Sequence, residues 1–149
     1  MERAYTSRRM GVVEALTTKL QTINGIHPFQ TDLENKVSSR LRFWDEISEF
    51  PYVCVTAGQE TRVYQPGGYK ERYMNVTIRC YVSEENAALS LEGLLEDIET
   101  VLEENSRLVY KDRLGATQYT QQITIISIDT DEGVLEPLGV GELTCEIRY

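Results

Sequence analysis

Apolar and polar residues alternate over residues 70–82, and this period of two predicts a long β-strand with one buried face. Residues 52–57 and 61–64 form shorter runs before it, and the Gln-Pro-Gly-Gly sequence at residues 65–68 is typical of a turn. The pattern therefore predicts a long β-hairpin. Its base is amphipathic, whereas its tip has few apolar residues, so we expect the tip to project into solvent or into a partner.

The last part of the chain shows further strand patterns. Residues 143–149 alternate between apolar and polar side chains, which predicts a final strand that is buried on one face. Residues 121–129 predict another strand, although the adjacent Ile125 and Ile126 break the alternation. Either both faces of this strand are buried or it contains a bulge. Residues 108–111 predict a short strand.

Two segments carry apolar residues at helical spacing. Residues 3–23 predict an amphipathic helix that begins at a Thr-Ser cap at residues 6–7 and ends at the Asn-Gly pair at residues 24–25. Residues 87–102 carry a continuous apolar stripe, with acidic residues mostly on the opposite face. We expect Ser83 to cap this second helix.

The order of these elements indicates the fold class. Strands that follow one another through turns favour an antiparallel sheet. We therefore expect an α+β fold: a mostly antiparallel sheet with two amphipathic helices packed on one face and a long projecting β-hairpin. Residues 40–44 fit either a strand or an ordered loop. The length, without repeats or low-complexity segments, predicts a single domain over residues 1–149.

Composition is that of a globular protein, with 41% hydrophobic and 26% charged residues. No apolar run reaches the roughly 18 residues that a membrane helix needs, and the first ten residues lack the apolar core of a secretory signal. The cysteines Cys54, Cys80 and Cys145 are odd in number and lie within predicted strands. We therefore expect reduced core residues in place of disulfides or a zinc site. The predicted turn glycines include Gly58, Gly139 and Gly141.

The net charge of −9 is unevenly distributed along the chain. Residues 1–80 contain 11 Lys and Arg against 9 Asp and Glu, whereas residues 81–149 contain 4 against 15. Two interpretations remain open. The excess of acid either supports solubility, or forms a surface past which DNA moves without binding.

The sequence contains no recognisable catalytic arrangement. His27 is the single histidine, and no phosphate-binding loop, nucleophile elbow or zinc-protease motif is present. Residues 129–133 have part of the spacing of a calcium loop, but they lack its further ligands and its flanking helices. We therefore predict that the protein is not an enzyme and uses no metal or cofactor.

Two groups of residues are candidates for surface contacts. The hairpin tip combines Tyr, Arg and Lys, which occur at protein interfaces and also where nucleic-acid bases stack. The negative net charge favours a protein contact. The candidate interface residues are Arg62, Tyr64, Gly67, Gly68, Tyr69, Lys70 and Arg72. The candidate acidic surface residues are Asp129, Asp131, Glu132 and Glu136. Arg3, Arg8 and Arg9 on the first helix allow the same two interpretations as the tip.

Several segments together carry a family resemblance. They are residues 43–53, residues 58–62, the glycine pair at 67–68, residues 91–99, and residues 130–142 directly before the terminal strand. In this order and at this length, the chain resembles the tail terminator (tail completion) proteins of long-tailed bacteriophages.

The resemblance implies a virion structural protein that assembles with itself as a ring, usually a hexamer. Such a ring caps the head-proximal end of the tail tube, ends polymerisation of the tail tube protein, and binds a neck or head-completion protein. DNA passes through its lumen without sequence-specific binding. The expected location is the virion tail, after assembly in the host cytoplasm, with no membrane contact. The alternatives are another head–tail connector or neck ring protein, and a small cytoplasmic binding module.

Overall fold

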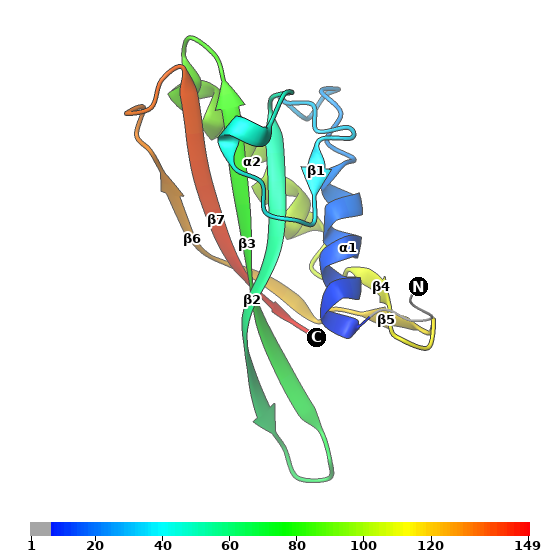
Figure 1. Cartoon of the computed structure of the whole chain (residues 1–149). Helices are drawn as coiled ribbons and strands as arrows, with labels where there is room; N and C mark the ends of the chain where they lie inside the picture. Colours follow the sequence, from blue (N-terminus) through cyan, green and yellow to red (C-terminus); the bar gives the residue numbers. More distant parts are fainter. Residues whose placement is uncertain (1–6) are drawn as a thin grey trace.

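The computed structural model describes residues 7–149, which form a five-stranded sheet, a two-stranded sheet and two α-helices (Figure 1). In chain order the elements are α1 (Arg8–Leu20), β1 (Val37–Ser38), the 3-10 helix η1 (Trp44–Glu46), β2 (Tyr52–Tyr64), β3 (Lys70–Ser83), α2 (Ala87–Glu104), β4 (Val109–Lys111), β5 (Thr117–Tyr119), β6 (Gln122–Thr130) and β7 (Leu138–Arg148). The main sheet has the order β1-β2-β3-β7-β6, and each neighbouring pair except β1–β2 is antiparallel. The predicted α+β class with a mostly antiparallel sheet is therefore confirmed.

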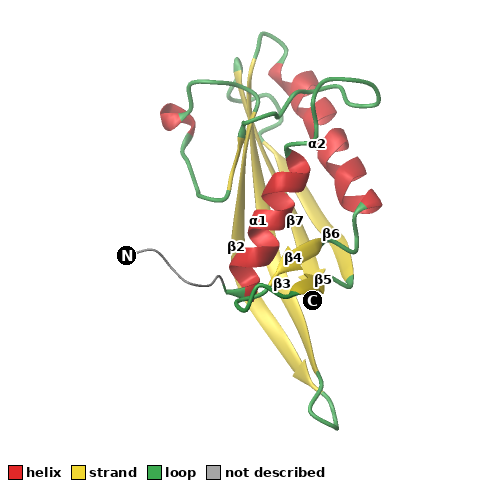
Figure 2. Cartoon of the chain, turned by 90° about the vertical axis from the view of Figure 1, so that its right-hand side faces the viewer, coloured by secondary structure: helices red, strands yellow, loops and turns green. Residues whose placement is uncertain are grey.

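One face of the main sheet is apolar because the alternation of neighbouring strands is in register. The buried pairs between β3 and β7 on this face are Met74–Ile147, Val76–Cys145 and Ile78–Leu143. Both helices bury residues against this face in one continuous core, and Figure 2 shows α1 and α2 on the same side of the sheet. Each fully buried aliphatic side chain contributes about 1.5–3 kcal/mol, so this layer supplies most of the stabilisation.

The first helix is shorter than its sequence pattern predicts. The Ser7 hydroxyl accepts a hydrogen bond from the backbone N–H of Met10 at 3.2 Å and so caps the helix. The helix ends at Leu20, although Ile23 is still buried and its N–H bonds to the Leu20 carbonyl. The predicted helical residues 3–6 lie outside the described part of the chain.

The prediction that Ser83 caps the second helix is wrong. Ser83 is the last residue of β3 and pairs with Leu138 of β7. The ladder holds the backbone extended at this point, so α2 begins only after Asn86. The local capping signal is overruled because strand pairing satisfies the backbone groups first.

Gly139 and Gly141 are not turn residues, as the sequence suggested, but lie inside β7, which begins well before residue 143. A Cβ atom added at Gly139 would lie 3.2 Å from Cβ of Ala87 in α2, besides 2.7 Å from Cγ2 of Val82 in β3, and one at Gly141 would lie 3.1 Å from Cδ1 of Leu91 in α2. The two glycines therefore allow α2 to pack directly against the sheet. Gly58 also lies within a strand, β2, beside a break in its register.

The segment before β2 covers part of the opposite face of the sheet. Residues 40–43 are a loop in the structure and Trp44 begins η1, so the loop alternative of the two predicted ones holds for this segment. Ile47 joins Cys54 and Tyr81 in a small buried cluster, and the Tyr81 hydroxyl donates to the Arg42 carbonyl at 3.0 Å. As predicted, all three cysteines are buried and free.

β2 and β3 form one antiparallel hairpin, paired from Tyr52–Tyr81 to Tyr64–Lys70, with a register shift after Ala57. Its distal part extends beyond the rest of the main sheet (Figure 1).

The last strands refine two predictions. β6 contains a bulge between Ile125 and Ser127, which is one of the two predicted alternatives. The predicted strand at residues 108–111 is β4, whereas its partner β5 was missed. Thr120 fastens this small sheet, because its buried hydroxyl accepts from the N–H of Leu108 and donates to the Ser106 carbonyl, both at 2.7 Å.

Candidate assembly surfaces

The distal part of the β2–β3 hairpin, residues 61–72, carries all seven residues that the sequence predicted as an interface; we call it the hairpin arm. At its tip Tyr64 and Tyr69 are 69% and 74% exposed. The Lys70 ammonium lies 5.8 Å from the centre of the Tyr64 ring, and the N–H of Gln65 bonds to the Tyr69 carbonyl at 2.8 Å. Exposed Tyr and Lys side chains on a paired backbone form a surface suited to a protein partner.

The turn at the tip depends on two adjacent glycines. Gly67 and Gly68 have φ angles of +84° and +86°, in the left-handed region that other residues rarely adopt. The predicted turn at residues 65–68 is therefore confirmed. The glycines shape the arm, whereas the tyrosines and the lysine present side chains to a partner.

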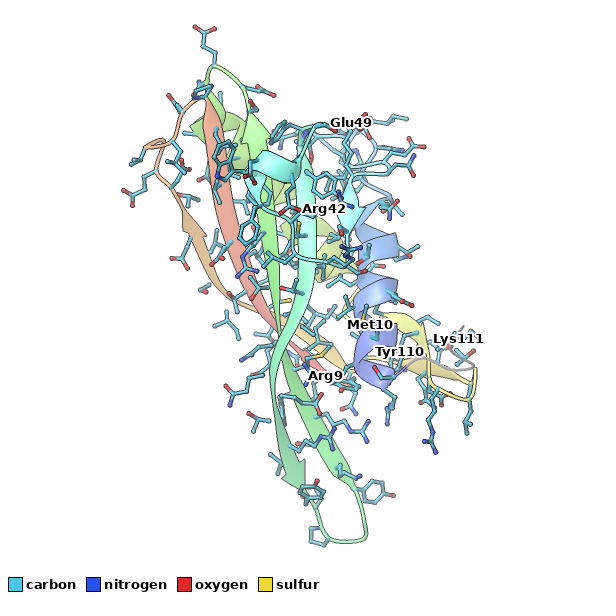
Figure 3. All side chains as sticks on the ribbon, viewed as in Figure 1. Arg9, Met10, Arg42, Glu49, Tyr110 and Lys111 are labelled. Carbon is cyan, nitrogen blue, oxygen red and sulfur yellow. The ribbon has the colours of Figure 1, made fainter. Side chains whose placement is uncertain are left out.

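Arg62 and Arg72 belong to a second group, nearer the base of the arm, where they lie opposite one another. With Arg8, Arg9 and Arg113 they line a cavity of about 470 Å³. We call these five side chains the arginine cluster. They come from the first turn of α1, the arm, and the β4–β5 turn, and Figure 3 shows Arg9 at this junction. Folding thus gathers cations from three distant segments.

Tyr149 lies at the centre of the arginine cluster and is only 4% exposed. The guanidinium carbons of Arg8 and Arg72 lie 5.5 and 5.7 Å from the centre of its ring, which is the range of a cation–π contact. Its N–H donates to the Arg72 carbonyl at 3.0 Å, and its hydroxyl donates to the Glu60 carboxylate. These contacts fix the last strand to the base of the arm.

Few carboxylates oppose this positive charge. Glu60 forms a 2.6 Å salt bridge with Arg62, and within residues 7–149 no other member of the cluster has one. Burial raises the pKa of the Glu60 carboxyl, but hydrogen bonds from Tyr149 and Arg62 outweigh burial and hold the pKa below its ordinary value. Asp112 also lines the cavity, and a hydrogen bond from Gln118 is the main cause of its lowered pKa. Both carboxyls are therefore charged at neutral pH, and the cavity keeps a positive balance.

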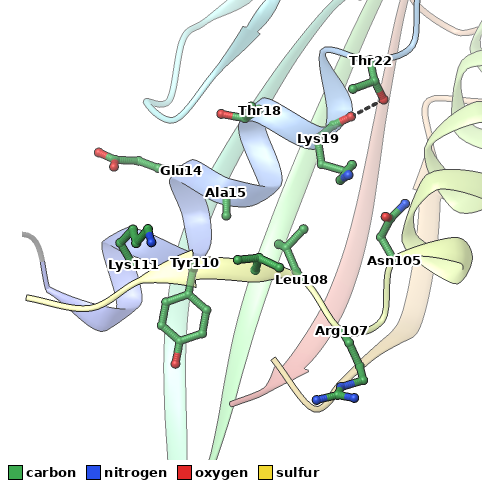
Figure 4. A pocket seen from close by; sticks show the side chains of 12 residues that line it. Glu14, Ala15, Thr18, Lys19, Thr22, Asn105, Arg107, Leu108, Tyr110 and Lys111 are labelled. Carbon is green, nitrogen blue, oxygen red and sulfur yellow. Dashed lines mark hydrogen bonds between the residues drawn. The ribbon is translucent and has the colours of Figure 1, made fainter. Parts of the chain in front are cut away.

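A larger cavity, of about 510 Å³, lies between α1 and β4 (Figure 4). Gly11 allows this close packing, since a Cβ atom there would lie 2.5 Å from the Lys111 carbonyl oxygen. Its lining mixes Glu14, Lys19 and Arg107 with apolar side chains, so it has no dominant charge. In the part of the chain that the structure describes, no group of His, Cys, Asp or Glu is arranged to hold a metal ion.

The second predicted surface lies at the β6–β7 turn, at the end of the sheet opposite the arm (Figure 1). Its four acidic residues are Asp129, near the end of β6, and Asp131, Glu132 and Glu136, in the turn itself; we call these four the acidic turn. Asp131 accepts from the N–H groups of Leu135 and Val140 at 3.1 and 3.3 Å, so it stabilises the turn itself. Glu136 accepts from the N–H of Ala88 at 3.5 Å, at the start of α2. The other two side chains are exposed, and a partner can reach them.

Sequence reasoning placed the arm and the acidic turn but missed the arginine cluster as a unit. Tyr149 carried a signal, because it ends the apolar face of an alternating strand. Arg113 carried none, since nothing local links the β4–β5 turn to the hairpin.

The fold and these surfaces define a class of protein: a small α+β structural protein that acts through contacts with other proteins. Comparison with known proteins agrees. The family described as "Bacteriophage Tail Tube Terminator Protein" matches residues 6–149. The tail tube terminator protein of Escherichia phage T5 is 31% identical over 149 residues, covering 95% of this chain and 92% of that protein. The chain therefore belongs to the bacteriophage tail tube terminator family.

A solved structure shares the fold. A chain in the virion of a native gene transfer agent particle superposes with a TM-score of 0.62, covering 96% of this chain and 98% of that one at 10% identity. At this identity the match speaks for the fold alone.

Family membership settles two predictions. The resemblance drawn from the sequence is confirmed, and so is the prediction that the protein is not an enzyme, because the family consists of structural components of the virion tail. Over residues 7–149, neither helix has the length and apolar character that crossing a membrane requires.

Proposed function

We propose that the protein forms a ring, a hexamer, at the head-proximal end of the tail tube. There it ends polymerisation of the tail tube protein and joins the tube to a neck or head-completion protein, while DNA passes through the lumen. Membership of the tail tube terminator family supports the position in the virion. The observation that carries the ring is the presence of two unlike open edges on one sheet.

The two open edges belong to β2 and β6. β6 is last in the strand order, so among residues 7–149 no strand pairs with its outer edge along Gln122–Thr130. On the other side β1 pairs with β2 only at Val53 and Cys54, which leaves residues 55–64 without a pairing strand on that edge in the described part of the chain. Open strand edges favour contact with another chain. Because these two differ, copies meet head to tail, and such contacts close into a ring when the rotation permits.

The hairpin arm is the part suited to reach beyond its own subunit. Its tip side chains Tyr64 and Tyr69 are exposed, and below them the paired strands hold the arm in a fixed direction. We assign the arm to contact with a neighbouring copy or with the tube. The acidic turn faces away from the arm, and its exposed Asp129 and Glu132 suit the lumen or the side that meets the neck, where like charge keeps DNA from binding.

Polymerisation of the tail tube protein in the presence of this chain tests the proposal. The wild-type chain should yield shorter tubes that carry a ring at one end in negative-stain electron micrographs. A variant in which residues 64–70 are replaced by Asn-Gly keeps the Arg62–Arg72 pair and closes the shortened hairpin with a favourable turn. Its core should fold normally, whereas its capping should be lost.

Two results would contradict the proposal. Tubes that grow to full length without a terminal ring in the presence of the wild-type chain would overturn the terminator ring. Rings and capping that survive the shortened hairpin would instead refute only the role of the arm.

A further inference from the structure

Helix α2 carries an acidic stripe along one flank. Its six charged residues are all acidic, and Glu92, Glu96, Glu99 and Glu103 are spaced by four, three and four positions. Residues at this spacing share one face of a helix, and like charges there repel. Glu103 also lies in the last turn, where a carboxylate opposes the helix dipole. We call these four residues the acidic stripe; it makes the isolated helix less stable.

The acidic stripe lies on the β6 side of the molecule. The opposite flank of α2 carries Asp97, which is buried and accepts hydrogen bonds from Gln30 and Thr31, in the loop that follows α1. Because an α-helix has 3.6 residues per turn, the stripe falls on the outer and β6-facing side, although Glu96 reaches back to accept a hydrogen bond from the Gln30 side chain at 3.2 Å. Glu92 lines one cavity with Asp131 at the end of β6, which confirms this placement.

No basic residue within the described part of the chain forms a salt bridge with the acidic stripe. The two salt bridges among residues 7–149 are Arg62–Glu60 and Arg79–Glu142. Glu92, Glu96 and Glu103 are exposed, and Glu99 is half-buried. Among the described residues, one chain thus presents carboxylates without a salt bridge along α2, which contacts β3, β7 and β6. It also presents arginines, of which only Arg62 has a salt bridge, at the base of the arm beside α1, where Arg9 donates to the Gly58 carbonyl of β2.

We propose that the acidic stripe of one copy packs against the arginine cluster of the next copy. This proposal rests on the proposed ring and identifies the contact that closes it. The acidic stripe follows the helix on the β7 and β6 side of the sheet, and the arginine cluster lies at the base of the arm beside α1, so a head-to-tail neighbour can bring the two face to face. α2 runs toward the arm end of the molecule (Figure 2), so Glu99 and Glu103 are the members nearest the cluster. The repulsion within α2 is then relieved by assembly.

A second copy suits the arginine cluster better than a nucleic acid does. The whole chain carries a net charge of −9, which repels phosphate backbones at long range. Asp112 lines the cavity and Glu60 pairs with Arg62, so the cluster offers separate cations in place of one continuous positive surface for a polyphosphate. The acidic stripe is a row of separate carboxylates, so each carboxylate can meet one of the separate arginines in the cluster.

Charge reversal tests the contact. Arg62→Glu with Arg113→Glu reverses exposed members of the cluster, and Glu99→Lys with Glu103→Lys reverses the stripe. Each double variant alone should raise the protein concentration needed for half-assembly by at least about tenfold, as measured by mass photometry and by capping of tail tubes. An equimolar mixture of the two should restore rings, because each variant then offers its reversed surface to a matching neighbour. Lys36→Glu with Arg40→Glu makes the same change of net charge as the arginine variant, outside the cluster, and should assemble normally.

The stripe variant also separates assembly from folding. Lysines in the second half of α2 remove like-charge repulsion and favour the helix dipole, so the monomer should unfold at an equal or higher temperature while assembly weakens. Normal assembly of both variants, or a mixture that stays unassembled, would overturn the contact. The contact would also be overturned if the Arg62→Glu/Arg113→Glu variant lost binding to a duplex DNA oligonucleotide but still formed rings. Wild-type protein that neither assembles nor caps tubes would contradict the proposed ring itself.

Discussion

The two halves of β3 are held in place by different interactions. From Met74 to Val82 the strand is paired on both sides, with β2 and β7, and every second side chain is fully or almost fully buried. At Lys70 and Glu71 it pairs with β2 alone, Arg72 gains one further backbone hydrogen bond from Tyr149, and these side chains are exposed or half-buried. In the packed half, contacts within the core restrict which residue can occupy each inward-facing position. In the arm the backbone ladder and the turn maintain the structure, so the side chains are available for a partner.

This comparison predicts that stability is concentrated in the packed half. Ile78 is fully buried between the two helices and the sheet, so Ile78→Ala removes buried apolar surface and leaves a cavity. The free energy of unfolding should fall by about 2–5 kcal/mol, as measured by urea denaturation of the unassembled chain. A loss below about 1 kcal/mol would show that the core can collapse around the gap and that the halves differ less than their burial indicates.

The contact between α2 and the sheet gives the next largest effect. An added methyl group at Gly139 would lie 2.7 Å from Cγ2 of Val82 and 3.3 Å from the backbone carbonyl of Ala87, so Gly139→Ala should destabilise the fold by about 1–3 kcal/mol. Gly141→Ala is the matched control. Its new methyl meets only the movable end of Leu91 and the Asp129 carbonyl at 3.5 Å, so its loss should be smaller. Equal losses would show that the close neighbours of Gly139 give way as easily as the Leu91 side chain does.

These glycines also show where sequence reasoning reaches its limit. Alternation over residues 70–82 and the apolar stripe of 87–102 located the packed half, because burial against one layer imposes a period on a strand or a helix. A glycine in a strand, however, has the same local pattern as a glycine in a turn. A glycine in a strand can be told from a glycine in a turn only by the close approach of α2. That approach is a feature of the tertiary structure.

The candidate site divides in the same way. The arm was predictable from its turn sequence and its exposed tyrosines, since both are local features. The arginine cluster was not, because Arg8, Arg62 and Arg113 lie far apart in the sequence and meet only when α1 and the β4–β5 turn pack beside the arm. The acidic stripe could be recognised in the sequence as the solvent-exposed face of a helix. Its proposed role in assembly, however, depends on where the folded chain places that face.

The junction between the two halves should respond to pH. Hydrogen bonds from Tyr149 and Arg62 hold the pKa of Glu60 below its ordinary value despite burial, so the ionised carboxylate stabilises the folded state. This stabilisation is present above the ordinary pKa of glutamate, near 4.3, and is lost as the pH falls through the lower pKa of the folded protein. Glu60→Gln should therefore be less stable than the wild type at pH 7, and the difference should shrink in denaturation series below about pH 4. Tyr149→Phe, which removes one donor to the carboxylate, should reproduce part of this behaviour. A difference that stays constant with pH would contradict the role of the charge.

Substitutions at the tip of the hairpin arm should have the smallest effect on stability but a large effect on assembly. Tyr64→Ser with Tyr69→Ser removes two exposed side chains that contribute nothing to the core. Substitutions of this kind change the free energy of unfolding by at most about 0.5 kcal/mol. If the tip contacts a neighbour or the tube, capping should nevertheless be lost, because buried tyrosines often dominate an interface. Tyr119→Ser serves as the control, since this tyrosine is half-exposed, at 50%, and lies on β5, outside the arm. A tip variant that caps tubes as well as this control would show that the exposed tyrosines are not held for a partner.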